Sequence, residues 1–74
     1  MLTLDELATR VQRARELRLT SVQELSNATG LSREAIYKIE RGERYGSIVT
    51  YMLIADALGI RLGDLLGETE GSTP

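Results

Sequence analysis

The segment formed by residues 21–42, SVQELSNATGLSREAIYKIERG, limits the fold more strongly than any other part of this sequence. Ser21 is a favourable N-cap, and Glu24, three residues later, completes a capping box. Gly30 can take the left-handed backbone conformation that ends a helix. Between these signals the apolar residues recur at helical spacing, at Val22, Leu25 and Ala28. The segment therefore predicts two short helices joined by a tight turn.

The second of these helices begins after the N-cap Ser32 and runs to Arg41, just before Gly42. At about 100° per residue, one side of it gathers Ser32, Ala35, Ile36 and Ile39. The opposite side gathers Arg33, Glu34, Tyr37, Lys38 and Arg41. A solvated helix face is also polar, but these side chains carry groups that can reach base edges or phosphates. The tight helix pair favours that role, because a helix-turn-helix motif lays its second helix in the DNA major groove.

The sequence resembles the phage repressor and Cro-like helix-turn-helix family over roughly residues 4–66. The residues that carry the resemblance are Leu25, Ser26, Gly30, Leu31, Ser32, Ile36, the string Ile39-Glu40-Arg41-Gly42, Ser47-Ile48, Ala55 through Gly59, and Leu65-Leu66. The resemblance implies an all-α fold, a compact five-helix lambda repressor-like domain over residues 1–66. Residues 67–74 are small, acidic and polar, and their composition predicts a disordered tail.

Composition limits the chain to one small domain and argues against several functions. The 74 residues include neither Cys nor His, so we expect no disulfide, metal site, cofactor or catalytic centre. No apolar run approaches the roughly 20 residues that span a bilayer, and the N-terminus lacks signal-peptide features, which favours a cytoplasmic protein. The family resemblance implies a bacterial or phage origin. The net charge is −2, but residues 31–45 carry +1 and residues 46–74 carry −3. The acidity therefore lies away from the candidate binding helix, where local charge matters more than the total.

A first helix is expected from the N-cap Thr3, with Glu6 in a capping box, to about Arg18. Its expected buried stripe is Leu4, Leu7, Ala8, Val11 and Ala14. Arg15 falls inside this stripe, where an unpaired charge is costly. The family resemblance implies that Arg15 pairs with Glu40 as a structural ion pair, and the helical geometry permits it.

Two further helices are expected after a turn-like loop. The fourth begins after Ser47 and ends at Gly59, with most of its apolar residues expected in the core: Ile48, Tyr51, Met52, Ile54, Ala55 and Leu58. Gly46 replaces a frequent proline of the family, which predicts a looser loop. The short fifth helix holds Leu62, Leu65 and Leu66. Together with Ile60 these leucines can form either a dimer contact or ordinary core packing, and both alternatives stay open.

The resemblance also implies a set of DNA-contacting residues. Arg33 and Lys38 are expected at base edges, Tyr37 at a base methyl group or a phosphate, and Glu34 is able to accept a bond from cytosine. The family usually has Gln at the position of Val22, which leaves the Val22 backbone amide for a phosphate. The full expected set is Ser21, Val22, Gln23, Ser32, Arg33, Glu34, Tyr37, Lys38, Arg41 and Arg44.

Two functions compete at this point. The first is a sequence-specific DNA-binding transcriptional regulator, a repressor in the simplest form, that acts as a homodimer on a two-fold operator in double-stranded DNA. The second is a protein-interaction module on the same fold, such as an antitoxin-like partner, an adaptor or an antirepressor. No small-molecule substrate and no membrane partner is indicated by the sequence.

Overall fold

The structure, a computed structural model, describes residues 2–67. This part of the chain folds into five α-helices and no strand: α1 (Leu4–Leu17), α2 (Val22–Thr29), α3 (Arg33–Glu40), α4 (Ile48–Leu58) and α5 (Leu62–Leu66). The predicted all-α, five-helix domain is therefore confirmed. The predicted tail lies outside the described residues except for Gly67, which is the C-cap of α5. None of the described helices combines the length and the apolar character that a membrane crossing requires.

Local capping signals set the ends of the helices. Thr3 and Glu6 form a reciprocal capping box at α1, with the two backbone-to-side-chain bonds at 2.8 and 3.1 Å. Ser21 and Glu24 repeat this arrangement at α2, at 2.8 and 3.0 Å. Because each box satisfies backbone N–H groups that a helix start leaves free, these short sequence signals place both N-termini.

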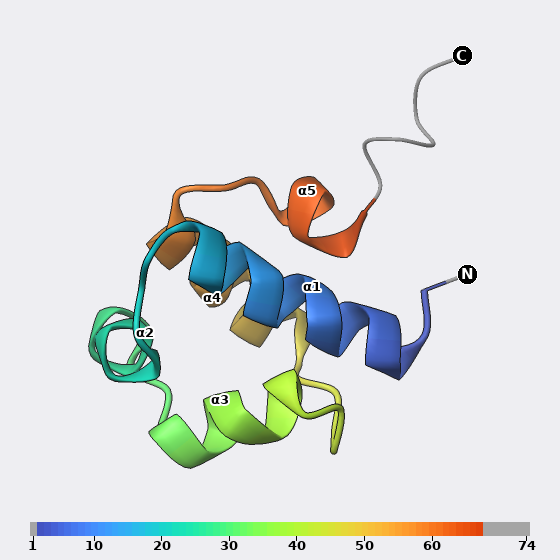
Figure 1. Ribbon diagram of the computed structural model, residues 1–74, viewed down its shortest axis with the longest axis horizontal. Coiled ribbons are helices and arrows are strands. Elements are labelled where there is room, and N and C mark those ends of the chain that lie inside the picture. The colour runs from blue at the N-terminus through green and yellow to red at the C-terminus, as the bar shows by residue number, and fades with distance from the viewer. Residues whose placement is uncertain (1, 68–74) are drawn as a thin grey trace.

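The core is built from the apolar inner faces of all five helices. The side chains that are almost completely buried are Val11, Leu25, Ile36, Ile39, Ile54 and Leu65. α1 runs through the centre of the domain, with α3 on one side of it and α5 on the other (Figure 1). The main helix contacts join α1 to α3 and α5, α2 to α3 and α4, and α4 to α5. α3 therefore lies at one edge of the domain, supported from one side.

Several side chains do not lie where the sequence predicts. Ile48 and Met52 were expected in the core, but they are 56% and 51% exposed. The buried face of α4 is formed instead by Tyr51, Ile54, Ala55 and Leu58. α4 is apolar on both sides, so helical spacing alone does not say which side faces inward. Ala28 is also exposed, because α2 turns Val22 and Leu25 toward the core.

The loop before α4 is closely packed rather than loose. The backbone N–H of Gly46 donates to the buried Tyr51 hydroxyl at 2.9 Å. A Cβ at Gly46 would come within 3.0 Å of a Thr50 side-chain atom and 3.3 Å of Ile39 Cδ1. A side chain at this position would require Thr50 or Ile39 to shift by a few tenths of an ångström.

Candidate DNA-contacting surface

The turn between α2 and α3 is held by two hydroxyl side chains. Gly30 takes φ +80° and closes α2. Ser26 Oγ donates to the Leu31 carbonyl at 2.6 Å. Thr29 Oγ1 donates to the Leu25 carbonyl at 2.7 Å and accepts from the Leu31 N–H at 3.1 Å. Because the N–H and the carbonyl of Leu31 are both bonded to α2 side chains, the chain leaves α2 along a defined path toward α3.

The inner face of α3 is fixed to the core. Ile36 and Ile39 are buried among the other core side chains, and Glu40 is buried beside them. Arg15 Nε lies 2.7 Å from Glu40 Oε2, and a second guanidinium nitrogen of Arg15 lies 3.0 Å from Glu40 Oε1. The third nitrogen donates to the Thr20 carbonyl at 2.9 Å. One arginine of α1 thus binds the last turn of α3 and the corner that leads into α2.

We call Arg15, Glu40 and the Thr20 carbonyl the clamp. The side chains of Arg15 and Glu40 are only 14% and 5% exposed, so little water screens the pair. The hydrogen bond to Glu40 raises the pKa of Arg15 above its ordinary value. The guanidinium therefore stays charged. Burial acts in the opposite direction but does not outweigh that bond. The expected ion pair is thus present as a bidentate, buried contact.

The outer face of α3 is exposed, and its side chains make mainly local contacts. Arg41 lies over the ring of Tyr37, with Cζ 5.9 Å from the ring centroid. Lys38 Nζ lies 3.6 Å from Glu34 Oε2, one turn earlier. Both groups of that pair are exposed, so water screens it and it is weak. Within residues 2–67, Arg33 takes part in no salt bridge. The face therefore presents a free guanidinium, an aromatic ring and a loosely paired ammonium group.

The start of α2 presents fewer free groups than the sequence suggests. The Ser21 hydroxyl accepts from the Glu24 N–H, and the Val22 side chain is buried. Gln23 Nε2 donates to Asn27 Oδ1 at 3.0 Å on the exposed side of the helix.

Beyond α3, Arg41 Nε pairs with Glu43 Oε2 at 2.7 Å, an exposed contact.

The loop after α3 adds one side chain that sequence reasoning missed. Arg44 is exposed there, and the neighbouring Tyr45 is 59% exposed. No helical periodicity includes Tyr45, because it follows Gly42 and precedes the next cap. The only signal available in the sequence is an aromatic residue directly beside a cation. Arg44 and Tyr45 lie four and five residues after Glu40, the last residue of α3.

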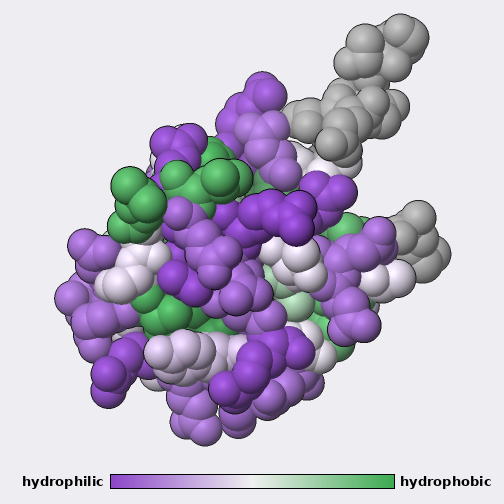
Figure 2. Space-filling view, viewed as in Figure 1, coloured by the Kyte–Doolittle hydropathy of each residue, from purple (hydrophilic) through white to green (hydrophobic). Residues whose placement is uncertain are grey.

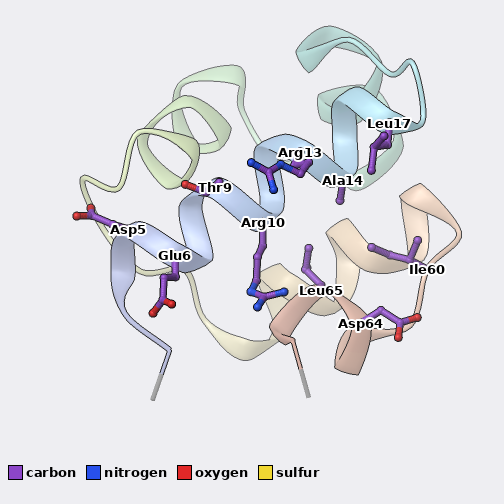
Figure 3. A pocket seen from close by; sticks show the side chains of 10 residues that line it. All are labelled: Asp5, Glu6, Thr9, Arg10, Arg13, Ala14, Leu17, Ile60, Asp64 and Leu65. Carbon is purple, nitrogen blue, oxygen red and sulfur yellow. The ribbon is translucent and has the colours of Figure 1, made fainter. Parts of the chain in front are cut away.

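A pocket of about 570 Å³ lies between α1 and α5, away from α3 (Figure 3). Arg10 points into it, and the Arg10 guanidinium covers the end of α5, because a Cβ at Gly67 would come within 2.5 Å of Arg10 Cζ. A cation at a helix C-terminus is stabilising, so Arg10 has a structural role. No group of three or more metal-binding side chains gathers in the described part of the chain.

Over α3, at the bottom of the view, the surface is mostly hydrophilic (Figure 2).

A tight helix pair that holds a polar second helix on the outside of an all-α core defines a helix-turn-helix domain. The sequence matches the family model of helix-turn-helix domains over residues 11–65. The chain therefore belongs to the lambda repressor and Cro-like helix-turn-helix family, a family of DNA-binding transcription regulators. No curated protein matches the sequence closely enough to count as a relative.

Proposed function

We propose that this protein is a sequence-specific transcriptional repressor that reads the DNA major groove with α3, as a homodimer on a two-fold operator. One observation carries the proposal: α3 is locked to the core by Ile36, Ile39 and the clamp, while its outer face is left to solvent. A rigid helix with an exposed, hydrogen-bonding outer face has the form that groove recognition needs. Its place of action would be bacterial or phage DNA in the cytoplasm.

The residues of the outer face divide into two roles. Arg33 and Lys38 read base edges, with guanine as the preferred partner of Arg33, since a guanidinium bonds the O6 and N7 atoms of guanine together. Tyr37, which is 44% exposed, contacts a base methyl group or a phosphate. Glu34 accepts from a cytosine amino group once Lys38 turns toward the DNA.

A second set of residues positions the DNA backbone. Arg41 and Arg44 contact phosphates at the end of α3 and in the loop that follows. At the other side of the motif, Ser21, the Val22 amide, Gln23 and Ser32 lie at the two helix starts, where backbone N–H groups favour phosphate. These contacts set the register of the domain on the duplex without reading its sequence.

Selection of bound duplexes from a random pool tests the proposal. The expected result is an enriched inverted repeat. With Arg33→Ala we expect relaxed base preference at one position of each half-site, because one bidentate contact is worth about 1–3 kcal/mol of discrimination. With Arg44→Ala we expect weaker binding to every duplex and a salt slope that is smaller by about one.

Arg13→Ala is the matched control for both variants. It removes the same charge from an exposed position of α1, beside the pocket of Figure 3 and away from α3. It should leave base preference unchanged and the affinity close to that of the parent. Equal behaviour of Arg33→Ala, Arg44→Ala and the parent on selected and random duplexes would contradict the assigned roles.

A protein-interaction module on the same fold is the competing function. The observation in its favour is the 3.6 Å pair between Glu34 and Lys38, which reduces the positive charge of the outer face. A titration at low salt separates the two functions. Binding of duplex DNA that weakens steeply as salt is added supports the repressor, and no binding at low salt supports the interaction module.

A further inference from the structure

The pocket between α1 and α5 has an apolar half and a charged half (Figure 3). Its volume of about 570 Å³ lies in the range of small-molecule sites in proteins. The apolar half is lined by Ala14, Leu17, Ile60 and Leu65. Leu65, for which the sequence leaves a dimer contact open, is only 1% exposed and belongs to the core. Ile60 packs against that core, so the apolar half has a fixed floor.

The charged half of the pocket contains side chains of both signs: Arg10, Arg13, Asp5, Glu6 and Asp64. The carboxylates are engaged elsewhere. Glu6 Oε1 accepts from the Thr3 backbone N–H at 2.8 Å, and Asp64 Oδ2 lies 3.5 Å from Arg61 Nε. The Asp5 carboxylate faces the turn after α3, where a Cβ in place of a glycine hydrogen would come within 3.0 Å of it.

The guanidinium of Arg10 lies flat against Gly67, at the end of α5. A Cβ at Gly67 would stand 2.5 Å from Arg10 Cζ, 2.7 Å from Nη2 and 2.9 Å from Nη1. Three such similar distances mean that Gly67 meets the face of the planar group and not its edge. The N–H groups lie in the plane of the guanidinium, so they point past Gly67.

The edge of this guanidinium has donors to spare. Within residues 2–67, Arg10 donates no hydrogen bond and takes part in no salt bridge, unlike Arg15, Arg41 and Arg61. The side chain is nevertheless half-buried and points into the pocket. A guanidinium edge of this kind binds a carboxylate through two parallel hydrogen bonds. Its face is already held by Gly67, which lowers the entropy cost of that contact.

The lining also limits the charge and the length of a ligand. The three carboxylates of the charged half oppose a second negative charge, so a monoanion fits better than a dianion. Leu17 lies seven residues after Arg10 on α1, about 10 Å further along the helix axis. An apolar chain that starts at Arg10 can therefore extend over Ala14 to Leu17, above the floor of Ile60 and Leu65.

We propose that this pocket binds a small monocarboxylate with an unbranched apolar chain. The carboxylate pairs with the edge of Arg10, and the chain lies along Leu17, Ile60 and Leu65. α5 lies on the other side of α1 from α3 (Figure 1), so the site is separate from the proposed DNA-contacting surface.

A titration with octanoate, followed by ¹⁵N–¹H NMR of the full chain, tests the proposal. The expected dissociation constant lies between about 10 μM and about 1 mM, as for a ligand of this size. The shifted amide signals should centre on Arg10, Leu17, Ile60 and Leu65. Octylammonium and octanol carry the same chain without the carboxylate, and each should bind about tenfold more weakly.

Two results of this titration overturn the proposal. One is octylammonium binding as tightly as octanoate, because the carboxylates of the lining would then decide the ligand. The other is a set of shifts that centres on Met52 and Leu53, which are 51% and 40% exposed on α4. Octanoate would then bind any exposed apolar surface.

Arg10→Gln tests the charged half of the site. It removes the paired N–H donors and the positive charge, and should weaken octanoate binding about tenfold. Arg18→Gln is the matched control, because Arg18 is an exposed arginine at the end of α1 that does not line the pocket. It should bind octanoate like the parent. An Arg10→Gln variant that is folded by circular dichroism and binds like the parent overturns the proposal.

Leu17→Glu tests the apolar half and does not depend on the fit of α5. Leu17 is 76% exposed, so the domain should stay folded, while the new carboxylate meets the end of the apolar chain. We expect about fivefold weaker binding of octanoate. Leu19→Glu adds the same charge at a residue that is 91% exposed and outside the pocket, and it should bind like the parent. Equal affinities of the two variants would contradict the proposed position of the chain.

The site and the proposed function can fail separately. A parent that binds octanoate at Arg10 but binds no duplex DNA at low salt keeps the site and contradicts the repressor. A parent that binds DNA but shows no octanoate-dependent shifts at Arg10 and Leu17 keeps the repressor and contradicts the site.

Discussion

The helices α3 and α4 are built alike on the inside and differ on the outside. Each starts at a serine whose hydroxyl accepts a backbone N–H, Ser32 from Ala35 at 3.0 Å and Ser47 from Thr50 at 3.2 Å. Each buries apolar side chains in the common core. Yet the outer face of α3 is charged and aromatic, whereas that of α4 is aliphatic.

This difference separates what folding requires from what function requires. The inner faces have the same task, because both helices must bury apolar surface to stabilise a small domain. Neither outer face contributes much to that task, since both are largely in solvent. Each outer face is therefore informative about its partner: a polyanion suits the cations of α3, and an apolar surface suits α4. The following variants test this separation, from the largest expected effect to the smallest.

Removing the clamp should have the largest effect on stability. Glu40→Ala leaves the buried guanidinium of Arg15 without its carboxylate, and we expect a loss of about 3–5 kcal/mol in the free energy of unfolding. Thermal unfolding followed by circular dichroism measures it, at roughly 4–8 °C per kcal/mol for a domain of this size. Glu43→Ala, which breaks the exposed pair with Arg41, should cost no more than about 1 kcal/mol. Equal melting temperatures for the two variants would show that burial does not distinguish these ion pairs.

Neighbouring residues of α3 should have opposite effects on folding and on DNA binding. Ile36→Ala opens a cavity in the core and should cost about 2–5 kcal/mol of stability. Tyr37→Ala, one residue later on the outer face, should change stability by no more than about 0.5 kcal/mol. Tyr37→Ala should nevertheless weaken DNA binding, measured by fluorescence anisotropy under conditions where both variants are folded. If Tyr37→Ala destabilised the domain as much as Ile36→Ala, the outer face of α3 would contribute to folding as much as the inner face, which would contradict this separation.

The two N-caps should be equal for stability and unequal for function. Ser32→Ala and Ser47→Ala each remove one capping bond and should each cost about 1 kcal/mol in urea unfolding. Only Ser32→Ala should also weaken DNA binding, because Ser32 lies at the start of the proposed reading helix. A comparable loss of DNA affinity with Ser47→Ala would place α4 in the DNA contact as well.

The smallest effect concerns the start of α1 and depends on pH. The Thr3 backbone N–H, and then the Thr3 side chain, hold the pKa of Glu6 below its ordinary value of 4.5. The folded pKa is therefore lower than the unfolded one, so this contribution is present above pH 4.5 and is lost as pH falls through the folded value. Urea unfolding of the parent and of Glu6→Gln should differ at pH 7 and converge in acid. The helices α3 and α4 have no such box at their starts, so neither offers a carboxylate of this kind.

Capping chemistry made most of the fold predictable from the sequence. The starts of α1 and α2 follow from two S/T-x-x-E patterns, and the end of α2 follows from Gly30. These signals are local, so a single sequence contains them. The inner face of α3 was predictable as well, because Ile36 and Ile39 stand opposite a run of charged residues.

The orientation of α4 was not predictable by the same means. Ile48 and Met52 are as apolar as the residues on the buried side, and only the position of α2 and α5 decides which face turns inward. The hydrogen bonds of Ser26 and Thr29 in the turn could not be predicted from the sequence either, since they depend on the path of the backbone around Gly30. The DNA-contacting roles of the α3 residues stay predictions that the experiments above address.

The separation of faces on α3 has a consequence for how such a domain diverges. The outward positions 33, 34, 37, 38 and 41 contribute no buried side chain and no part of the clamp. A combinatorial library over these positions should therefore yield folded proteins in most of its members. New operator preferences then require changes of a few surface side chains, with the inherited scaffold retained.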